Sequence, residues 1–392
     1  MKALRNYLNK IKPNFEDGGK LHAFRSVYEG FEAFLYVSND TSKSGTNIHD
    51  AIDSKRIMSI VVIALLPALF FGMYNVGYQH FIHTTGIGSF WEMFGYGFLA
   101  ILPKLIVSYV VGLGIEFVVA QWKKEEIQEG YLVSGILIPL IVPVDCPLWI
   151  MAVAVAFAVI FAKEVFGGTG MNIFNVAIVA RAFMFLAYPA KMSGDAVWVS
   201  GGSICGIGNG VDGLTAATSL GIASTTVNPN GYVPFSWDMV TGLIPGSIGE
   251  TSVIAILIGA IILLWTGIAS WKTMLSVFVG GGLMAWIFNV IGPNTAMANM
   301  PWYEHLVLGG FCFGAVFMAT DPVTSARTEK GKYIFGFLIG VMAIVIRVLN
   351  PGYPEGMMFA ILLMNIFAPL IDYCVVQSNI KNREKRAIKS NF

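Results

Sequence analysis

The chain has 392 residues, of which 55% are hydrophobic and only 12% are charged, and its formal net charge is +1. Soluble domains carry about 25% charged residues, so this composition excludes a disordered chain and an ordinary water-soluble enzyme. The near-zero net charge provides no basic field, and nucleic acid is not expected as a partner. The four cysteines are widely spaced without a C-x-x-C pair, so neither a metal site nor a disulfide framework is indicated.

Ten apolar runs follow a polar N-terminal segment and predict an all-α polytopic membrane protein with about ten transmembrane helices. A membrane-crossing helix needs about 20 predominantly apolar residues. Because ten is an even number, both termini are predicted on the same side of the membrane. The runs cover residues 57–74, 97–119, 131–142, 148–165, 173–187, 252–267, 273–291, 305–319, 333–349 and 357–375.

Positive charges are divided unequally between alternate loops. Twenty of the 25 Lys and Arg residues lie in the two terminal segments and in the loops 120–130, 268–272 and 320–332, whereas the alternate loops contain only Lys191. Lys and Arg accumulate in cytoplasmic loops. Both termini are therefore predicted to be cytoplasmic, which places the long loop 188–251 on the outer side.

Several apolar runs are too short for a complete crossing and end at a proline, as at Pro143 and Pro189. Such runs are typical of broken or re-entrant helices packed inside the protein. Two sequence patterns, Leu-Val-x-Gly and Asn-Ile-Phe, recur in both halves of the chain, and the second Asn-Ile-Phe segment precedes Pro369. They predict two five-helix repeats with interrupted helices, an architecture of many transporters. The predicted organisation is a cytoplasmic amphipathic segment (1–56), a first repeat (57–187), an outer loop (188–251), a second repeat (252–375) and a basic tail (376–392).

The outer loop contains the segment Asp212-Gly-Leu-Thr-Ala-Ala-Thr218, which combines one acid and two hydroxyls with very small residues. Loops of this length are uncommon unless they are functional or disordered. A hydroxyl that receives a phosphoryl group needs an open approach and a nearby acid to hold a metal. The alternative is a surface loop rich in Gly, Ser and Thr, and short motifs alone do not separate the two interpretations.

This segment resembles the flavin-attachment motif Asp-Gly-x-Ser/Thr-Gly/Ser-Ala-Thr, whose last Thr carries FMN through a phosphoester bond. The whole chain is similar to the B subunit of the Na⁺-translocating NADH:quinone oxidoreductases. The stretches that carry this similarity occur in order along the chain: Asp53-Ser-Lys-Arg-Ile-Met58, Ala162-Lys-Glu-Val-Phe-Gly-Gly-Thr-Gly170, Ile244-Pro-Gly-Ser-Ile-Gly-Glu250, Gly309-Gly-Phe-Cys-Phe-Gly314, Met318-Ala-Thr-Asp-Pro322 and Asn350-Pro-Gly-Tyr-Pro-Glu-Gly-Met357.

The resemblance implies that Thr218 carries covalent FMN, with Thr215 as the competing acceptor. Ala216 stands where this subunit more often has Gly, and Ala is small enough to preserve the expectation. The motif residues expected to support attachment are Asp212, Gly213, Thr215 and Ala217.

A second flavin is implied at the Gly-rich and amide-rich stretch 166–175, which opens a short apolar run. From the residues alone, helix capping and close packing explain this stretch more simply. The resemblance implies that a non-covalent riboflavin binds here, with Asn172 and Asn175 as hydrogen-bonding partners. Arg181 follows in the same run and must face the protein interior because a charge is costly in lipid. It either neutralises a reduced flavin or pairs with an acid.

Acids in or beside the spans are functional candidates for the same reason. By resemblance, Gly112 and Glu116 lie where quinone binds. Residues alone also allow Glu116 to extend to the cytoplasmic surface, near Lys123.

Asp321 and Asp372 each end an apolar run on the predicted cytoplasmic side, and the resemblance links them to Na⁺ uptake. Sodium prefers oxygen ligands, and Pro369 is expected to free a carbonyl near Asn365 beside Asp372. The alternative is that these two acids are solvated helix ends.

The resemblance thus implies a membrane redox subunit of a sodium-pumping NADH:quinone reductase in a bacterial inner membrane. Electrons pass from FMN on the outer side to riboflavin and then to a quinone, coupled to Na⁺ export, and the flavins supply the redox chemistry. No nucleotide-binding fingerprint is present, so NADH oxidation is expected on a separate flavoprotein subunit. A further subunit with covalent FMN is implied as a partner.

Two other functions are compatible with the same spans. One is the D subunit of the related complex that couples ferredoxin and NAD, which shares the flavin-threonine motif. The polar N-terminal extension and the Asp53-Ser-Lys-Arg stretch favour the quinone reductase. The other is a channel or secondary carrier without a redox role, which leaves the segment 212–218 unexplained.

Overall fold

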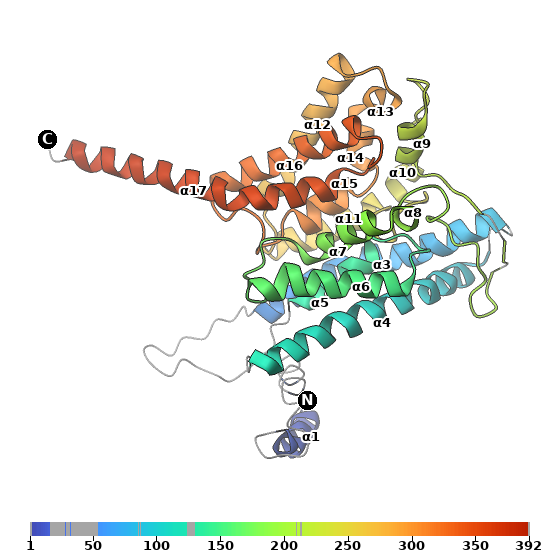
Figure 1. The fold of residues 1–392 in the computed structure, drawn as a ribbon, viewed down its shortest axis with the longest axis horizontal. Coiled ribbons are helices and arrows are strands. Elements are labelled where there is room, and N and C mark those ends of the chain that lie inside the picture. The colour runs from blue at the N-terminus through green and yellow to red at the C-terminus, as the bar shows by residue number, and fades with distance from the viewer. Residues whose placement is uncertain are drawn as a thin grey trace.

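The computed structural model describes residues 2–15, 28, 32, 54–84, 86, 88–123, 130–208, 210–211 and 214–390. These residues form helices joined by irregular segments, and no β-strand element occurs among them (Figure 1). Six of the helices are long and apolar enough to cross a bilayer. The prediction of an all-α polytopic membrane protein is therefore confirmed. The number of complete crossings and the side that the termini face stay predictions.

Each of the ten predicted apolar runs coincides with one helical segment. The six long segments are α3 (Ser54–Thr84), α4 (Phe90–Lys123), α6 (Leu148–Ala158) with its π-helical continuation η3 (Val159–Lys163), α12 (Trp271–Ile291), α16 (Glu329–Leu349) and α17 (Met357–Ser390). The shorter segments are α5 (Tyr131–Leu140), α7 (Val176–Ala187), α11 (Val253–Trp265) and the interrupted series α14 (Trp302–Val307), α15 (Phe311–Phe313) and η5 (Gly314–Met318). Minor helices are α1 (Lys2–Ile11), η1 (Lys12–Asn14), η4 (Glu164–Phe166), α8 (Pro189–Met192), α9 (Ser219–Thr225), α10 (Asp238–Thr241) and α13 (Ala296–Asn299).

Helix α3 continues about three turns beyond the predicted run because its polar residues find partners inside the protein. Asn75 Nδ2 donates to the carbonyl of Ile244 at 3.0 Å, and His80 Nδ1 lies 2.7 Å from the carbonyl of Ser200. Both side chains are buried. A hydropathy pattern places the end of a span at such polar residues. In the folded chain, these residues hold the loop 188–251 against the C-terminal part of α3.

The prediction that the helix breaks at Pro369 is wrong. Helix α17 runs without interruption from Met357 to Ser390, with Pro369 inside it. Proline removes one backbone N–H and leaves the carbonyl four residues earlier without its helical donor. Packing of α17 against α16, α7 and η5 holds the helix together across this point. The breaks predicted at the other two prolines are present, since α5 ends before Pro143 and α7 ends before Pro189, and residues 308–310 also separate α14 from α15.

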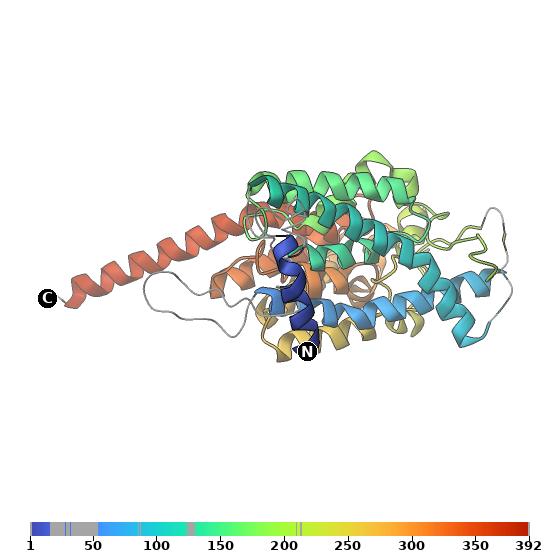
Figure 2. The same ribbon diagram turned by 90° about the horizontal axis from the view of Figure 1, so that it is seen from below.

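The helices form an elongated bundle in which the two halves of the chain have similar neighbours. In the first half α4 packs against α5 and α6, and α6 packs against α7. In the second half α12 packs against α14 and α16, and α16 packs against α17. The halves meet where α3 packs against α11 and α7 against α17. Helices α8 and α9 lie at one end of the bundle, and the C-terminal part of α17 projects from the other end (Figures 1 and 2).

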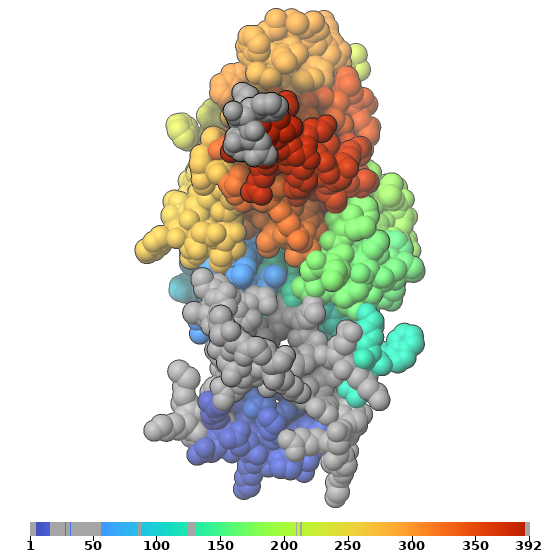
Figure 3. Space-filling view, turned by 90° about the vertical axis from the view of Figure 1, so that its left-hand side faces the viewer, coloured from blue at the N-terminus to red at the C-terminus, as the bar shows by residue number. Residues whose placement is uncertain are grey.

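The predicted amphipathic segment at the N-terminus lies largely outside the described residues. In the part that is described, Tyr28 donates its hydroxyl hydrogen to the carbonyl of Leu8 at 2.8 Å, and Lys12 pairs with Glu32 at 3.2 Å. Helix α1 and the projecting end of α17 are both visible when the molecule is viewed from the end where α17 projects (Figure 3).

Glycine allows the long helices to approach each other closely. A Cβ atom at Gly97 of α4 would fall on the backbone carbonyl oxygen of Met73 in α3, and one at Gly340 of α16 would fall on that of Val277 in α12. Small residues at helix contacts are a general feature of membrane helix packing, because apolar surface alone gives no preference for protein over lipid. These positions fix the α3–α4 and α12–α16 pairs.

We expect Gly97→Ala to destabilise the fold by about 1–3 kcal/mol, because the added methyl group has no space at the α3–α4 contact. Gly114→Ala, the same substitution on the same helix, is the control, because a Cβ atom there meets no atom within 4 Å. Thermal unfolding of the detergent-purified chain measures the difference. Equal transition temperatures for the two variants would show that Gly97 does not set the α3–α4 approach.

Candidate functional site

Thr218 contributes to the walls of two cavities between the outer loop and the ends of the helices. The first is lined by Trp198, Ile244, Ser247, Glu250, Leu308 and Glu355, among others. The second is lined by Arg181, Phe185, Asp195, Trp198, Tyr353 and Glu355, among others. The predicted attachment residue and the predicted buried arginine therefore share one cavity, although they lie in different segments of the chain.

The hydroxyl of Thr218 is held at the start of α9. Thr218 is the N-cap residue, and its Oγ1 accepts a hydrogen bond from the N–H of Gly221 at 3.0 Å. A Cβ atom at position 221 would lie 3.1 Å from this oxygen, so Gly221 leaves the hydroxyl approachable. A half-buried hydroxyl that faces two cavities fits a phosphoester-linked group.

The structure describes two of the four other motif residues. Asp212 and Gly213 lie outside the described residues. Thr215 is exposed and lines neither of the two cavities. Ala217 is half-buried, and the N–H of the preceding residue, Ala216, donates to the carbonyl of Asp195 at 2.7 Å. The two hydroxyls of the motif thus have different surroundings, and Thr218 is the one that lines these two cavities.

Arg181 is buried on α7 and pairs with two glutamates. One guanidinium nitrogen donates to Glu250 at 2.8 Å, and the other contacts the carboxylate of Glu355. The sequence left open whether Arg181 neutralises a reduced flavin or pairs with an acid, and in the structure it pairs with acids. A buried charge is tolerated only when it is paired and hydrogen-bonded. Both glutamates stand in sequence stretches that carry the family resemblance, but no role was predicted for them. Arg181 is 69 or more residues away from each, so the pairing is not visible in the sequence.

Arg347 of α16 is a second buried arginine and was not predicted from the sequence. It is fully buried and donates to the carbonyls of His305 at 2.6 Å, Leu308 at 3.2 Å and Glu355 at 3.1 Å. The last carbonyls of a helix lack intrahelical donors. Arg347 thus supplies hydrogen-bond donors to the free carbonyls at the break after α14. A charge inside the run 333–349 was the available signal.

The segment between α16 and α17 completes the wall of the second cavity. Tyr353 lies in this segment, and its ring packs against Phe185 with centroids 4.6 Å apart. Burial raises the pKa of the Tyr353 hydroxyl above its ordinary value, so this group stays protonated at neutral pH. It is a neutral hydrogen-bond donor beside the charged Arg181 and Glu355.

A third pocket lies between the two halves of the chain and brings together residues predicted for different roles. Asn172, Asn175 and Asp321 all line it. The Nδ2 of Asn175 donates to Asp321 Oδ2 at 3.3 Å. Asp321 also accepts from Val323 N and Thr324 Oγ1. The amide pair and the acid therefore form one polar wall, although they were predicted to belong to two separate features, a flavin site and an ion path.

The two asparagines of this pocket also serve the backbone. Asn175 caps α7, with its Oδ1 accepting from Ala177 N at 3.1 Å and Ile178 N at 3.3 Å. Asn172 Nδ2 donates to the carbonyl of Phe174 at 3.0 Å. The helix-capping interpretation therefore holds for Asn175, and capping leaves its Nδ2 directed at the pocket wall.

An additional polar atom in this pocket has no partner among the described residues. Thr169 lines the pocket, and its Oγ1 is buried without a hydrogen bond. A Cβ atom at Gly130, which also lines the pocket, would collide with the Thr169 side chain, so Gly130 provides its space. Buried polar atoms are nearly always satisfied. The orphan hydroxyl fits a bound molecule that has polar ring atoms.

Gly112 has a packing role on α4. A Cβ atom at this position would fall inside the ring of Tyr131 from α5. The Tyr131 hydroxyl donates to the carbonyl of Ser108 at 3.0 Å and is buried against α4. The side chain of residue 112 therefore determines whether α5 can lie against α4.

Glu116 is buried four residues later and does not extend to the surface near Lys123. It pairs instead with Lys163 of η3, and both side chains are only 5% exposed. Lys123 pairs with Glu164 at 3.5 Å. Lys163 also lines the pocket of Asn172 and Asn175. The candidate quinone region and the candidate flavin pocket therefore meet at one ion pair.

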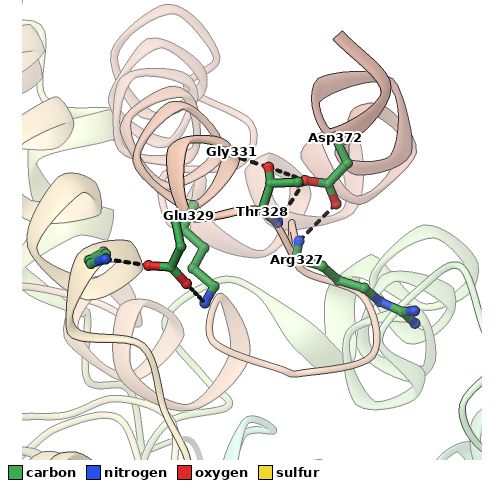
Figure 4. Close-up of polar contacts among 7 residues, drawn as sticks. Arg327, Thr328, Glu329, Gly331 and Asp372 are labelled. Carbon is green, nitrogen blue, oxygen red and sulfur yellow. Dashed lines mark hydrogen bonds and ion pairs between the residues drawn. The ribbon is translucent and has the colours of Figure 1, made fainter. Parts of the chain in front are cut away.

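Asp372 attaches α17 to the beginning of α16 (Figure 4). Its carboxylate accepts from Arg327 N at 2.8 Å, Thr328 N at 3.0 Å and Thr328 Oγ1 at 2.6 Å. Thr328 is in turn the N-cap residue of α16, and its Oγ1 accepts from Gly331 N. Glu329 beside it bridges Lys272 and Lys332. Asp372 is thus an acid engaged by backbone donors rather than an acid with free oxygens.

Comparison with known proteins groups this chain with one membrane protein family. A family model described as the NQR2, RnfD, RnfE family matches residues 41–381. The chain belongs to this family. It is 45% identical to the B subunit of the Na(+)-translocating NADH-quinone reductase of Chromohalobacter salexigens, over 98% of this chain and 96% of that protein. The subunits of the same name from Ectopseudomonas mendocina and Pseudoalteromonas atlantica are 44% and 43% identical over 98% of this chain.

The region matched by the family model includes all three cavities. The matched region contains Thr218, Arg181 and Glu355, which line the second cavity (called the outer site below). It also contains Asn175 and Asp321 of the third pocket. Helix α1 lies outside it. The parts of the chain that build the candidate sites are therefore those that the family shares.

We expect Asp372→Ala to loosen the start of α16 and to cost about 1–2 kcal/mol, because it removes a capping acceptor from two backbone amides. Amide hydrogen exchange of Arg327 and Thr328 should accelerate, with a lower unfolding temperature. Glu329→Gln is the matched control, since its carboxylate is 63% exposed and pairs of this kind contribute little. Unchanged exchange at Arg327 and Thr328 would remove the capping role from Asp372.

Proposed function

We propose that the chain is the B subunit of a bacterial Na⁺-translocating NADH-quinone reductase, acting as a multi-pass redox subunit of the inner membrane. The observation that carries this proposal is the Thr218 hydroxyl, which faces two cavities beside the buried Arg181–Glu250–Glu355 cluster. The names of the relatives support sodium translocation, NADH and quinone as the context. They favour this subunit over the D subunit of the related ferredoxin-coupled complex.

The outer site is proposed to hold FMN covalently, with the phosphoester on Thr218 Oγ1. FMN supplies reversible electron transfer when it is bound. The chain's residues position it, because Gly221 leaves space at the hydroxyl and Trp198 and Tyr353 offer aromatic walls. Arg181, with its charge shared between Glu250 and Glu355, provides a cation beside the cavity. Asp212 and Gly213 are proposed to support attachment, as the motif resemblance implies.

Replacement of Thr218 by Ala should abolish flavin fluorescence of this chain in a denaturing gel, because the phosphoester acceptor is lost. Thr215→Ala is the matched control and should keep most of the fluorescence, since Thr215 lies outside both cavities. Ultraviolet illumination of the unstained gel measures both. Fluorescence that persists without Thr218, or disappears without Thr215, would move the attachment residue. A chain that never carries flavin would instead favour a channel or carrier.

The third pocket is proposed to hold riboflavin without a covalent bond. Asn172, Asn175 and the unpartnered hydroxyl of Thr169 supply polar atoms, and Phe317 and Leu137 supply apolar surface. The pocket includes residues of the loops 268–272 and 320–332, which the charge distribution predicts to be cytoplasmic. Electrons that pass from Thr218 to this pocket therefore move from the outer side toward the cytoplasmic side.

We expect the double variant Thr169→Val and Asn172→Leu to reduce recovered riboflavin several-fold, because both pocket groups lose their hydrogen-bonding capacity. Acid extraction and chromatography of the purified complex measure the flavin-to-protein ratio. Thr266→Val with Asn294→Leu is the matched control, since it makes the same two substitutions at exposed positions that line none of the three cavities. An unchanged riboflavin ratio in the double variant, with covalent labelling intact, would leave this stretch with only its capping and packing roles.

Quinone reduction is proposed for the region where α4 and η3 meet this pocket, and Na⁺ transport for the segment 321–328 that leads from the pocket to α16. Gly112 and Glu116 define the proposed quinone region, and Asp321 and Asp372 the proposed Na⁺ path. Asp321 faces the pocket, so it is the better candidate for direct contact with the ion. Asp372, held by Arg327 and Thr328, positions the loop that follows Asp321. NADH oxidation and a second covalent FMN are assigned to other subunits of the complex.

A further inference from the structure

Lys163 is the single cationic side chain among the described residues that line the third pocket. It is the last residue of the π-helical turn η3 and is buried within the protein. The same pocket is also lined by Phe317 from η5, the second π-helical turn of the described chain. π-Helical turns inside α-helices occur frequently at functional sites. Two of them, from different halves of the chain, face the same pocket.

The charge of Lys163 is shared between the pocket and Glu116. Its ammonium contacts Glu116 Oε1, and the second carboxylate oxygen, Oε2, is buried without a partner among the described residues. An ammonium group has three donors, and one is used in this contact. The carbonyl of Lys163 also accepts from Gly168 N at 3.1 Å, which holds the turn that leads to Thr169. The contact with Glu116 therefore holds the side chain against α4, and the backbone bond holds the turn beside the pocket.

We propose that Lys163 is the electrostatic partner of the ligand in this pocket and makes the pocket favour the reduced form of that ligand. This inference rests on the proposed riboflavin site. Two-electron reduction adds two electrons and one proton to the flavin ring near neutral pH, which leaves the ring with one negative charge. A buried cation stabilises this charge far more than an exposed one does, because few water molecules screen it.

Glu116 has the opposite effect in this arrangement. Its carboxylate contacts Lys163 without lining the pocket itself, and it offsets part of the ammonium charge that the pocket ligand experiences. Removal of the negative charge therefore increases the effective positive charge at the pocket. Glu116 is a positioning residue here, acting on the pocket through Lys163 and not through contact with the ligand.

Removing the charge of Lys163 and removing the charge of Glu116 should change the relative affinity for reduced and oxidised riboflavin in opposite directions. Lys163→Met should lower the ratio of reduced to oxidised riboflavin affinity by roughly tenfold or more, and Glu116→Gln should raise it. A purely structural ion pair predicts that both variants weaken the binding of both forms together. Lys163→Arg keeps the charge and should stay near the parent ratio. Lys123→Met, at the more exposed pair with Glu164, is the matched control and should not shift it.

The experiment uses the full chain in detergent with Thr218→Ala, so that riboflavin is its one added flavin. Dithionite is the reductant, and spectroelectrochemical titration of bound against free riboflavin gives the affinity ratio. Opposite shifts for Lys163→Met and Glu116→Gln support the proposal. Riboflavin binding with shifts in the same direction, or with no shift, overturns the role of Lys163 and leaves the pocket intact. Absence of riboflavin binding to the Thr218→Ala parent overturns the proposed pocket itself, and the Lys163 inference with it.

Discussion

A charged side chain within a bilayer must find its partner inside the protein, and this requirement organises the described spans. Four cationic side chains are almost completely buried there: Lys104, Lys163, Arg181 and Arg347. Each donates to a group on another segment of the chain. Lys163 and Arg181 pair with carboxylates, whereas Lys104 donates to the carbonyl of Val144 and Arg347 to three carbonyls. The two that pair with carboxylates, Lys163 and Arg181, each line one of the candidate cavities.

The cations that donate to carbonyls stabilise the interruptions in the helices. Irregular backbone at membrane depth is tolerated only where its polar groups are satisfied by protein or by water. Lys104 of α4 supplies a donor to the linker that follows α5, and Arg347 of α16 supplies donors to the break that follows α14. In each half of the chain, a long helix thus provides the charge that its broken neighbour needs. A cation near free carbonyls is also favourable because of the helix dipole.

The apolar runs located all ten helical segments, because the cost of exposing polar groups to lipid is visible in composition alone. The interruptions at Pro143 and Pro189 were also predictable, since proline ends an apolar run there. Pro369 was misjudged because tertiary packing, which the local sequence does not contain, holds α17 together. The ion pairs were not predictable for a related reason. Their members are 47 to 174 residues apart in the sequence. A charge within an apolar run therefore indicates that a partner exists but does not identify the partner.

The short helix α7 connects the two proposed flavin sites. Its N-cap, Asn175, lines the pocket between the halves, and Arg181 on the same helix lines the cavity of Thr218. Six residues separate them, which corresponds to about 9 Å along the axis at 1.5 Å per residue. A hydrocarbon core is about 30 Å thick. Because one short helix contributes to both, the walls of the two cavities lie within two turns of each other, well below this thickness. The interrupted helices therefore bring the two proposed sites close together, and the buried cations that donate to free carbonyls are what allow the helices to be interrupted.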